Sequence, residues 1–363
     1  MISVTRIARL GVRLAAWATP HVKEWHRKRH LNRVEGERHL KARNWSEAEK
    51  HLAAALDERR HSSKRRLDLL LGLTEAQRKQ GKAAEAEKTS QMAIALATSA
   101  KNKVLQSRAL DGLVDIQLDQ KKYGEVEQTI AKIEALEKSL PAPDYKRLAS
   151  SSRKLGTALL NSGRSEDALK AFERAMQLAE KSFGPDHLET ANALTELGER
   201  YRQAGNHPEA QRCLRRALEI HRKSSDSHAA TRDLFHLAAS LEESGDLDGA
   251  ASQYEKALAV ADRQIGGDRE QLAETQAHLA AIYMRAGRTS AARELLIHAI
   301  GVLRKKDERL EFALETMADV EEMLHHPEEA QRWRDKAAES FASRTGQAPQ
   351  EAVGAVKQAP KYY

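Results

Sequence analysis

Apolar residues recur every three or four positions in the stretch 184–221, the most regular part of the chain. This spacing places them on one face of a helix, and it occurs twice with an interruption between. The first stripe contains Ala191, Leu194, Gly198 and Tyr201, and the second contains Ala210, Leu214, Ala217 and His221. Between the stripes, Gly205 supplies the positive φ that ends many helices, and Pro208 suits the first turn of a new helix. The stretch therefore predicts a helical hairpin.

The beginning of this hairpin has a predicted cap. Asp186 follows a Gly-Pro pair, and its carboxylate can accept from the unpaired N–H groups of a first helical turn. Glu189, three residues later, can complete a capping box. We therefore expect the first helix to begin directly after Asp186.

The same template recurs along the chain. Counted from Gly198, which we call the notch position, it has glycine at +7, alanine at +12, a large residue at +16 and alanine at +19. The other notch positions are Gly156, Ala238 and Ala280 in strong copies, and Gly36, Thr74, Val114 and Ala318 in weaker ones. Successive notch positions lie 38 to 42 residues apart. A fixed period of this length predicts an all-α solenoid of about eight helical hairpins, whose core runs along the array.

The composition agrees with this architecture. Aromatic residues make up only 4% of the 363 residues, which suits helices that approach closely through small side chains. No apolar run approaches the roughly 18 residues needed to span a bilayer. The lone Cys213 lies beside the second stripe, so we expect a small packed residue, no intrachain disulfide and a reducing compartment. The sequence predicts a cytoplasmic protein.

These residues resemble the tetratricopeptide repeat (TPR). The small residue, the aromatic residue and the two alanines of that family match Gly198, Tyr201, Ala210 and Ala217. The spacing of about 42 residues and the helix start at 183–194 are similar to the kinesin light chain subgroup. The resemblance covers about residues 30–340, and the predicted solenoid spans residues 30–342. It implies a right-handed superhelix that acts as a protein-interaction scaffold or adaptor, and not as an enzyme.

The resemblance also implies where a protein or peptide partner binds, because this family typically uses the first helix of each hairpin. The asparagine ladder of kinesin light chains would lie at Glu196, His236 and His278, so it is absent here. We expect arginines to bind acidic groups of the partner through bidentate hydrogen bonds. The candidate groove residues are Arg108, Arg153, Asn161, Asn192, Arg202, Arg232, Phe235 and Arg285. The alternative interpretation is an ordinary solvated charged face.

The formal net charge of +7 is concentrated at the N-terminus. Residues 1–45 contain eleven Lys and Arg against three acidic residues, and the remainder of the chain carries −1. The repeats therefore lack the basic surface expected of a nucleic-acid-binding protein, which argues against nucleic acid as a partner. The run 27–29, Arg-Lys-Arg, leaves one alternative open: a TPR regulatory module whose basic N-terminus contacts nucleic acid.

Residues 1–29 form a predicted basic amphipathic segment. Its apolar stripe contains Ile7, Leu10, Leu14 and Trp17, and arginines lie on the opposite side. Three interpretations stay open: a helix on an anionic membrane surface through residues 1–19, a targeting peptide, or a helix that caps the first hairpin. At the other end, residues 343–363 are rich in Gly, Pro, Gln and Ala and are predicted to be a disordered tail.

The sequence contains no catalytic or cofactor motif. His26 and His30 share a helical spacing, and His325 and His326 are adjacent, but neither pair has a third ligand in a recognisable metal motif. The second pair, followed by Pro327, resembles the hairpin turn before Pro208. We found no Gly-rich phosphate loop, HExxH or GxSxG. We therefore expect a binding protein without metal, cofactor or catalytic residues.

Overall fold

The computed structural model describes residues 31–56, 62–261, 269–304 and 307–346, which are helical apart from short connections and contain no strand. The chain forms two compact units, Met1–Ala175 and Met176–Tyr363. The first unit contains a helix at 31–41, α2 (Trp45–Leu56), α3 (Ser63–Lys79), α4 (Ala83–Ser99), α5 (Lys103–Asp119), α6 (Tyr123–Lys138), α7 (Tyr145–Asn161) and most of α8 (Ser165–Phe183). The second contains the end of α8, α9 (Leu188–Gln203), α10 (His207–Lys223), α11 (Ser227–Glu243), α12 (Leu247–Ala261), α13 (Arg269–Arg285), α14 (Thr289–Val302), α15 (Glu308–Met323) and α16 (Pro327–Thr345).

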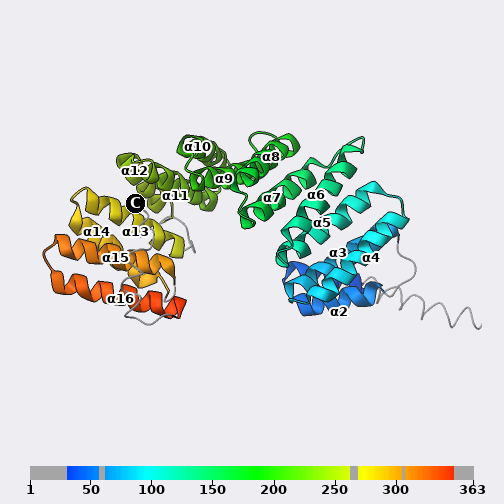
Figure 1. The fold of residues 1–363 in the computed structure, drawn as a ribbon, viewed down its shortest axis with the longest axis horizontal. Helices are drawn as coiled ribbons and strands as arrows, with labels where there is room; N and C mark the ends of the chain where they lie inside the picture. Colours follow the sequence, from blue (N-terminus) through cyan, green and yellow to red (C-terminus); the bar gives the residue numbers. More distant parts are fainter. Residues whose placement is uncertain (1–30, 57–61, 262–268, 305–306, 347–363) are drawn as a thin grey trace, which may run out of the picture. The chain divides into compact units, whose positions relative to one another are not determined.

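Helices that follow one another in the chain lie side by side as hairpins (Figure 1). In the first unit α3 packs on α4 and α5 on α6, and in the second α9 packs on α10, α11 on α12, α13 on α14 and α15 on α16. Contacts between α4 and α5, α10 and α11, α12 and α13, and α14 and α15 join successive hairpins. Together with the pairs formed by 31–41 and α2 and by α7 and α8, the described residues contain eight hairpins. The predicted all-α repeat solenoid is confirmed.

The notch positions lie where the two helices of a hairpin cross. A Cβ atom on Gly198 would be 2.7 Å from Leu214 Cγ, and one on Gly156 would be 2.8 Å from the ring of Phe172. Gly36 is equally close to a leucine side chain of α2. In each case the small residue faces the large residue at +16, so the template describes the helix crossing itself.

The turn between the two helices of a hairpin needs a residue with positive φ. Gly205 has φ 73°, as predicted, and the glycines at the same position of the other strong repeats also have positive φ. In the last hairpin His325 takes this role with φ 62°, and Pro327 lies in the first turn of α16, as Pro208 does in α10. The predicted similarity of these two turns is therefore confirmed.

The last residue of the second stripe, His221, joins two hairpins through a polar contact. Its side chain is fully buried, and its Nδ1 lies 2.6 Å from Oδ2 of the equally buried Asp233 on α11. Thr195 of α9 donates its hydroxyl to the other oxygen of the same carboxylate at 2.6 Å. The buried carboxylate of Asp233 is tolerated because both of its oxygens are hydrogen-bonded. Cys213 is buried on α10, as predicted.

Two predicted boundaries differ from the structure. Asp186 is not the cap of α9; the N-cap is His187, whose Nδ1 accepts from the backbone N–H of Glu189 at 3.1 Å. The imidazole is one residue closer to the helix and takes the role of the carboxylate. The C-terminal tail was predicted from residue 343, but α16 continues to Thr345, because Arg344 pairs with Glu311 through two hydrogen bonds.

Several predictions concern residues that the structure does not describe. The amphipathic stripe of Ile7, Leu10, Leu14 and Trp17 and the basic run 27–29 lie outside the described residues, as do His26, His30 and residues 347–363. Among the helices that are described, none combines the length and apolar character needed to cross a membrane.

Candidate binding face of the second unit

The first helices of neighbouring hairpins contact each other through residues six positions before the notch. Arg232 of α11 donates from Nη2 to Oδ1 of Asn192 on α9 at 3.2 Å. In the first unit, Arg108 of α5 donates from Nη2 to Oδ1 of Asp68 on α3 at 2.6 Å. Three predicted groove residues thus link successive hairpins.

The second unit has a pocket on the face formed by its first helices. Its volume is about 180 Å³, and every lining residue comes from α9, α11, α13 or α15. We call it the first-helix pocket; the lining residues used below are Arg202, Phe235, Glu242, Glu243, Glu274, His278, Glu308, Arg309 and Phe312. Four successive hairpins therefore build one concave site from the helices that the sequence predicted to bind a partner.

Aromatic side chains follow one another across three of these helices. The ring of His278 on α13 lies 5.7 Å from that of Phe235 on α11 and 4.9 Å from that of Phe312 on α15, measured between centroids. The ring of Tyr254 on α12 stacks on that of His278 at 5.7 Å between centroids, and Tyr254 is fully buried. The pocket therefore has an aromatic row that suits an apolar or cationic side chain.

Charged side chains surround this row, and acidic ones predominate. Four glutamates and two arginines line the pocket. The arginines are already paired: Arg202 with Glu243, and Arg309 with Asp307 at 2.7 Å and Glu270 at 3.1 Å. Arg309 also lowers the pKa of Asp307 through its hydrogen bond to that carboxylate. The glutamates of the lining therefore outnumber its arginines by two.

Three polar atoms in this lining have no hydrogen-bond partner among the described residues. Glu242 is 6% exposed, and its Oε2 accepts from the hydroxyl of Tyr254 at 3.1 Å and lies 3.4 Å from His278 Nδ1. Its other oxygen, Oε1, has no hydrogen-bond partner, and neither do the Nε of Arg202 and the Nδ1 of His278. A buried acceptor without a donor costs free energy, which a bound ligand or water can recover.

Glu274 adds a second desolvated carboxylate. Burial raises the pKa of Glu274 above its ordinary 4.5, although His278 and Arg309 act in the opposite direction. Its neighbour Arg309 is 3.4 Å away and is shared with two other carboxylates. A further cation in the pocket would stabilise the ionised form of Glu274.

The structure brings only some of the predicted groove residues together. Arg202 and Phe235 line the first-helix pocket, and Asn192 binds Arg232. Arg285 is exposed on α13 outside the lining. The others belong to the first unit, where Arg153 and Asn161 are exposed and Arg108 is paired with Asp68.

Sequence reasoning missed one glutamate of the pocket and one ring of its aromatic row. Glu274 and Phe312 lie six positions before the notches Ala280 and Ala318. This is the position of Arg108, Asn192 and Arg232, which were predicted. Reading that one position through every repeat would have found both residues.

Sequence comparison identifies the repeats. Two tetratricopeptide repeat models match the chain, one over residues 147–223 and 229–305 and the other over residues 33–101. The matched ranges cover more than half of the chain. A search of curated protein sequences finds no match.

Solved structures of similar fold include three with TM-scores above 0.5. RapI in its apo form has a TM-score of 0.59 at 17% identity, covering 80% of this chain and 80% of that chain. The apo form of the quorum sensor NprR from B. thuringiensis has a TM-score of 0.56 at 16% identity, covering 83% of this chain and 81% of that chain. BtubC (BKLC) from P. vanneervenii has a TM-score of 0.54 at 19% identity, covering 61% of this chain and 89% of that chain. At these identities the similarity shows the fold alone.

The fold, the repeat period and the pocket on the first helices define a helical-hairpin repeat protein. The sequence matches make the assignment specific: the chain belongs to the tetratricopeptide repeat family.

Proposed function

We propose that this protein is an interaction scaffold that binds a peptide segment of a partner protein in the first-helix pocket. The segment carries a lysine or arginine whose cation lies among the pocket carboxylates and against the aromatic row. The observation that carries this proposal is the unpaired Oε1 of Glu242, a buried acceptor in a pocket of negative charge.

The size of the pocket favours one anchoring side chain over a cofactor. Its volume of about 180 Å³ is below the roughly 300–1,000 Å³ typical of small-molecule sites. A lysine or arginine has the length to reach the carboxylates while its methylene groups contact Phe235 and Phe312. A guanidinium or ammonium group beside an aromatic face gains further cation–π stabilisation.

A protein of similar fold supports a peptide as the partner. NprR has also been solved in complex with its cognate peptide NprX. Two of the unpaired atoms of the pocket suit such a ligand, because the Arg202 Nε can donate to a peptide carbonyl while the Glu242 Oε1 accepts from a basic side chain. We infer binding and not catalysis, since the proteins of this fold typically act without chemistry.

Selection from a random peptide library displayed on phage, with the full-length protein immobilised, tests this proposal. We expect enriched sequences to contain lysine or arginine next to an apolar or aromatic residue. The double variant Glu242→Gln/Glu274→Gln keeps the side-chain shapes and removes two charges, so the basic enrichment should disappear. The matched control is Glu219→Gln, an exposed glutamate on the second helix α10, which should select the same sequences as wild type.

The outcomes separate the two parts of the proposal. The sequence predicts a groove whose arginines bind acidic groups. Enrichment of acidic peptides would therefore contradict the proposal that the pocket binds a basic side chain, while peptide binding itself would be supported. No enrichment of any sequence by the wild-type protein would contradict peptide binding itself.

A second part of the proposed function concerns the N-terminal segment. Attachment to an anionic membrane through residues 1–19 is supported only by the amphipathic sequence pattern. Deleting residues 1–19 should abolish co-sedimentation with phosphatidylserine-containing vesicles. Equal co-sedimentation of both forms would exclude membrane attachment by this segment.

The nucleic-acid alternative rests on the basic run at Arg27, Lys28 and Arg29 and has its own test. It requires a salt-sensitive shift of duplex DNA that is lost when these three residues become alanine. Absence of a shift at low salt would exclude it.

A further inference from the structure

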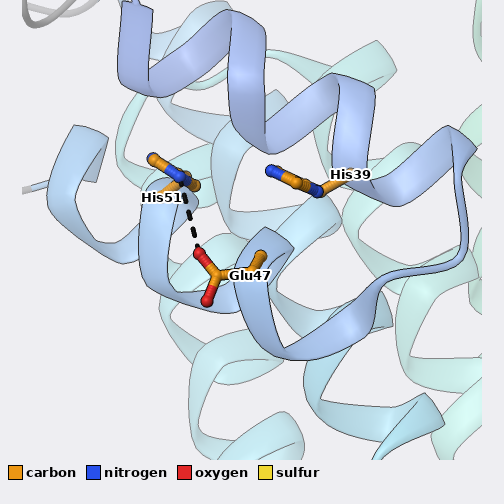
Figure 2. A group of neighbouring side chains, drawn as sticks. All are labelled: His39, Glu47 and His51. Atoms are coloured by element: carbon orange, nitrogen blue, oxygen red, sulfur yellow. Dashed lines mark ion pairs between the residues drawn. The ribbon is translucent and has the colours of Figure 1, made fainter.

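We propose that His39, Glu47 and His51 of the first hairpin form a binding site for a divalent transition-metal ion, with zinc as the expected ion. One ligand atom from each residue can be chosen so that all three lie within 4.8 Å of one another. Figure 2 shows the three side chains converging between two helices. The inference is independent of the proposed function, because it concerns the first unit and a different ligand.

The fold of the hairpin brings these side chains together. His39 belongs to the helix at 31–41, while Glu47 and His51 are four residues apart on α2 and therefore share one face. The helix crossing at Gly36 fixes the distance between the two helices, since a Cβ there would be 2.8 Å from Leu52. The metal ligands thus come from both helices of one tightly packed hairpin.

The distances suit a metal after small side-chain rotations. His51 Nε2 lies 3.8 Å from Glu47 Oε2, and the imidazoles of His39 and His51 stack at 5.5 Å with 8° between their planes. Ligand bonds of about 2.0–2.2 Å in tetrahedral geometry bring the ligand atoms to about 3.3–3.5 Å from one another. The side chains must therefore close by less than about 1.5 Å, and they are only partly buried, with Glu47 41% exposed.

A neighbouring side chain already orients one of the histidines. The Nδ1 of His51 lies 3.2 Å from Oδ1 of Asn32. An amide oxygen only accepts hydrogen bonds, so this contact places the proton of a neutral imidazole on Nδ1 and leaves the lone pair on Nε2, beside Glu47. Metal-binding histidines typically have such a partner on their second nitrogen.

The ligand set indicates the kind of ion. Two imidazoles and one carboxylate are the ligands that zinc and its transition-metal neighbours accept, whereas calcium and magnesium prefer oxygen atoms alone. Glu35, whose Oε2 lies 3.9 Å from His39 Nε2, or water can supply a fourth ligand. The ion would join the two helices of the first hairpin, which begins the described part of the array.

Titration of the metal-free, untagged full-length protein with zinc tests the proposal by calorimetry. The chain contains other histidines, so the measured quantity is the difference between wild type and variants. Wild type should bind one zinc ion more than the variants His39→Ala and His51→Ala, or bind it at least about tenfold more tightly. Asn32→Ala should weaken this site while leaving its ligands in place. The matched control is His298→Ala, an exposed histidine of α14, which should bind zinc as wild type does.

Cobalt supplies a spectroscopic signature that an ion pair cannot produce. Co²⁺ added to wild type should give visible d–d absorption of four-coordinate intensity, and the variant His39→Ala should lose it. Circular dichroism of each variant checks that the fold is retained. Equal zinc stoichiometry and affinity in wild type, His39→Ala and His51→Ala would overturn the proposal and leave only an ion pair between Glu47 and His51.

Discussion

The interior of the hairpins and the first-helix pocket use the same helices for different purposes. On α11, Ala238 is fully buried in the core, while Glu242, one turn later, lines the pocket with an unpaired oxygen. A small residue recurs at the notch of every strong repeat, but the position of Glu242 is Arg202 in one neighbouring hairpin and Met284 in the other. Repeated positions therefore specify packing, and positions that vary between repeats are available for recognition.

The largest effect on packing in the interior of the hairpins should come from removing a large residue that faces a notch position. Leu214→Ala should lower the free energy of unfolding by about 2–5 kcal/mol, because the side chain is fully buried and leaves a cavity. Denaturant unfolding measures this. The same change at the half-exposed Ile297 should cost much less; a similar loss at both sites would mean that Leu214 has no special role.

Adding volume at the notch should be the next largest effect. Gly198→Leu should destabilise the second unit by about 1–3 kcal/mol, because the new side chain must displace Leu214. The control Gly301→Leu adds the same side chain to a helical glycine with no neighbouring atom within 4 Å, and should be nearly neutral. An unchanged midpoint for Gly198→Leu in a denaturant titration would show that the repeat register is wrong.

Binding of a basic peptide in the first-helix pocket should depend on pH. Burial raises the pKa of Glu274, so its charge is lost at a higher pH than that of an exposed glutamate. A basic peptide binds the ionised form, and its affinity should therefore fall about tenfold, or about 1.4 kcal/mol, as the pH drops through that pKa. Calorimetry between pH 7 and pH 4.5 measures this, and Glu274→Gln should flatten the profile. A profile that is identical in this variant would exclude Glu274 as the titrating group.

Links between first helices should have the smallest effect. Arg232→Ala removes the hydrogen bond to Asn192 and should cost less than about 1 kcal/mol, because partly exposed polar pairs contribute little. Thermal unfolding is the measurement. A loss as large as that of Leu214→Ala would mean that polar contacts, and not the notch crossings, hold neighbouring hairpins together.

The packing of each hairpin could be predicted from the sequence because it depends on residues within that hairpin. The pairing of Gly198 with Leu214 and the positive φ of Gly205 follow from residue size and backbone freedom. Even the error at Asp186 was local, since His187 replaced it as the cap of α9. The spacing of residues within one hairpin is therefore sufficient to predict the fold.

The pocket could be predicted only in part because its properties depend on neighbouring repeats. Arg202 was expected to be available for a partner, but Glu243 of the next first helix pairs with it. The acidic lining includes Glu242 and Glu274, whose burial depends on the stacking of neighbouring hairpins. Likewise, His39 and His51 come from different helices, so no helical spacing relates them.

The central claim is that the variable positions of the first helices bind the partner, and hydrogen exchange tests it most directly. The full-length protein is compared with and without a basic peptide obtained by the library selection. We expect added protection in α11, α13 and α15 of the second unit and little change in the second helices α10, α12 and α14. Protection confined to the second helices, or to the first unit, would contradict the account.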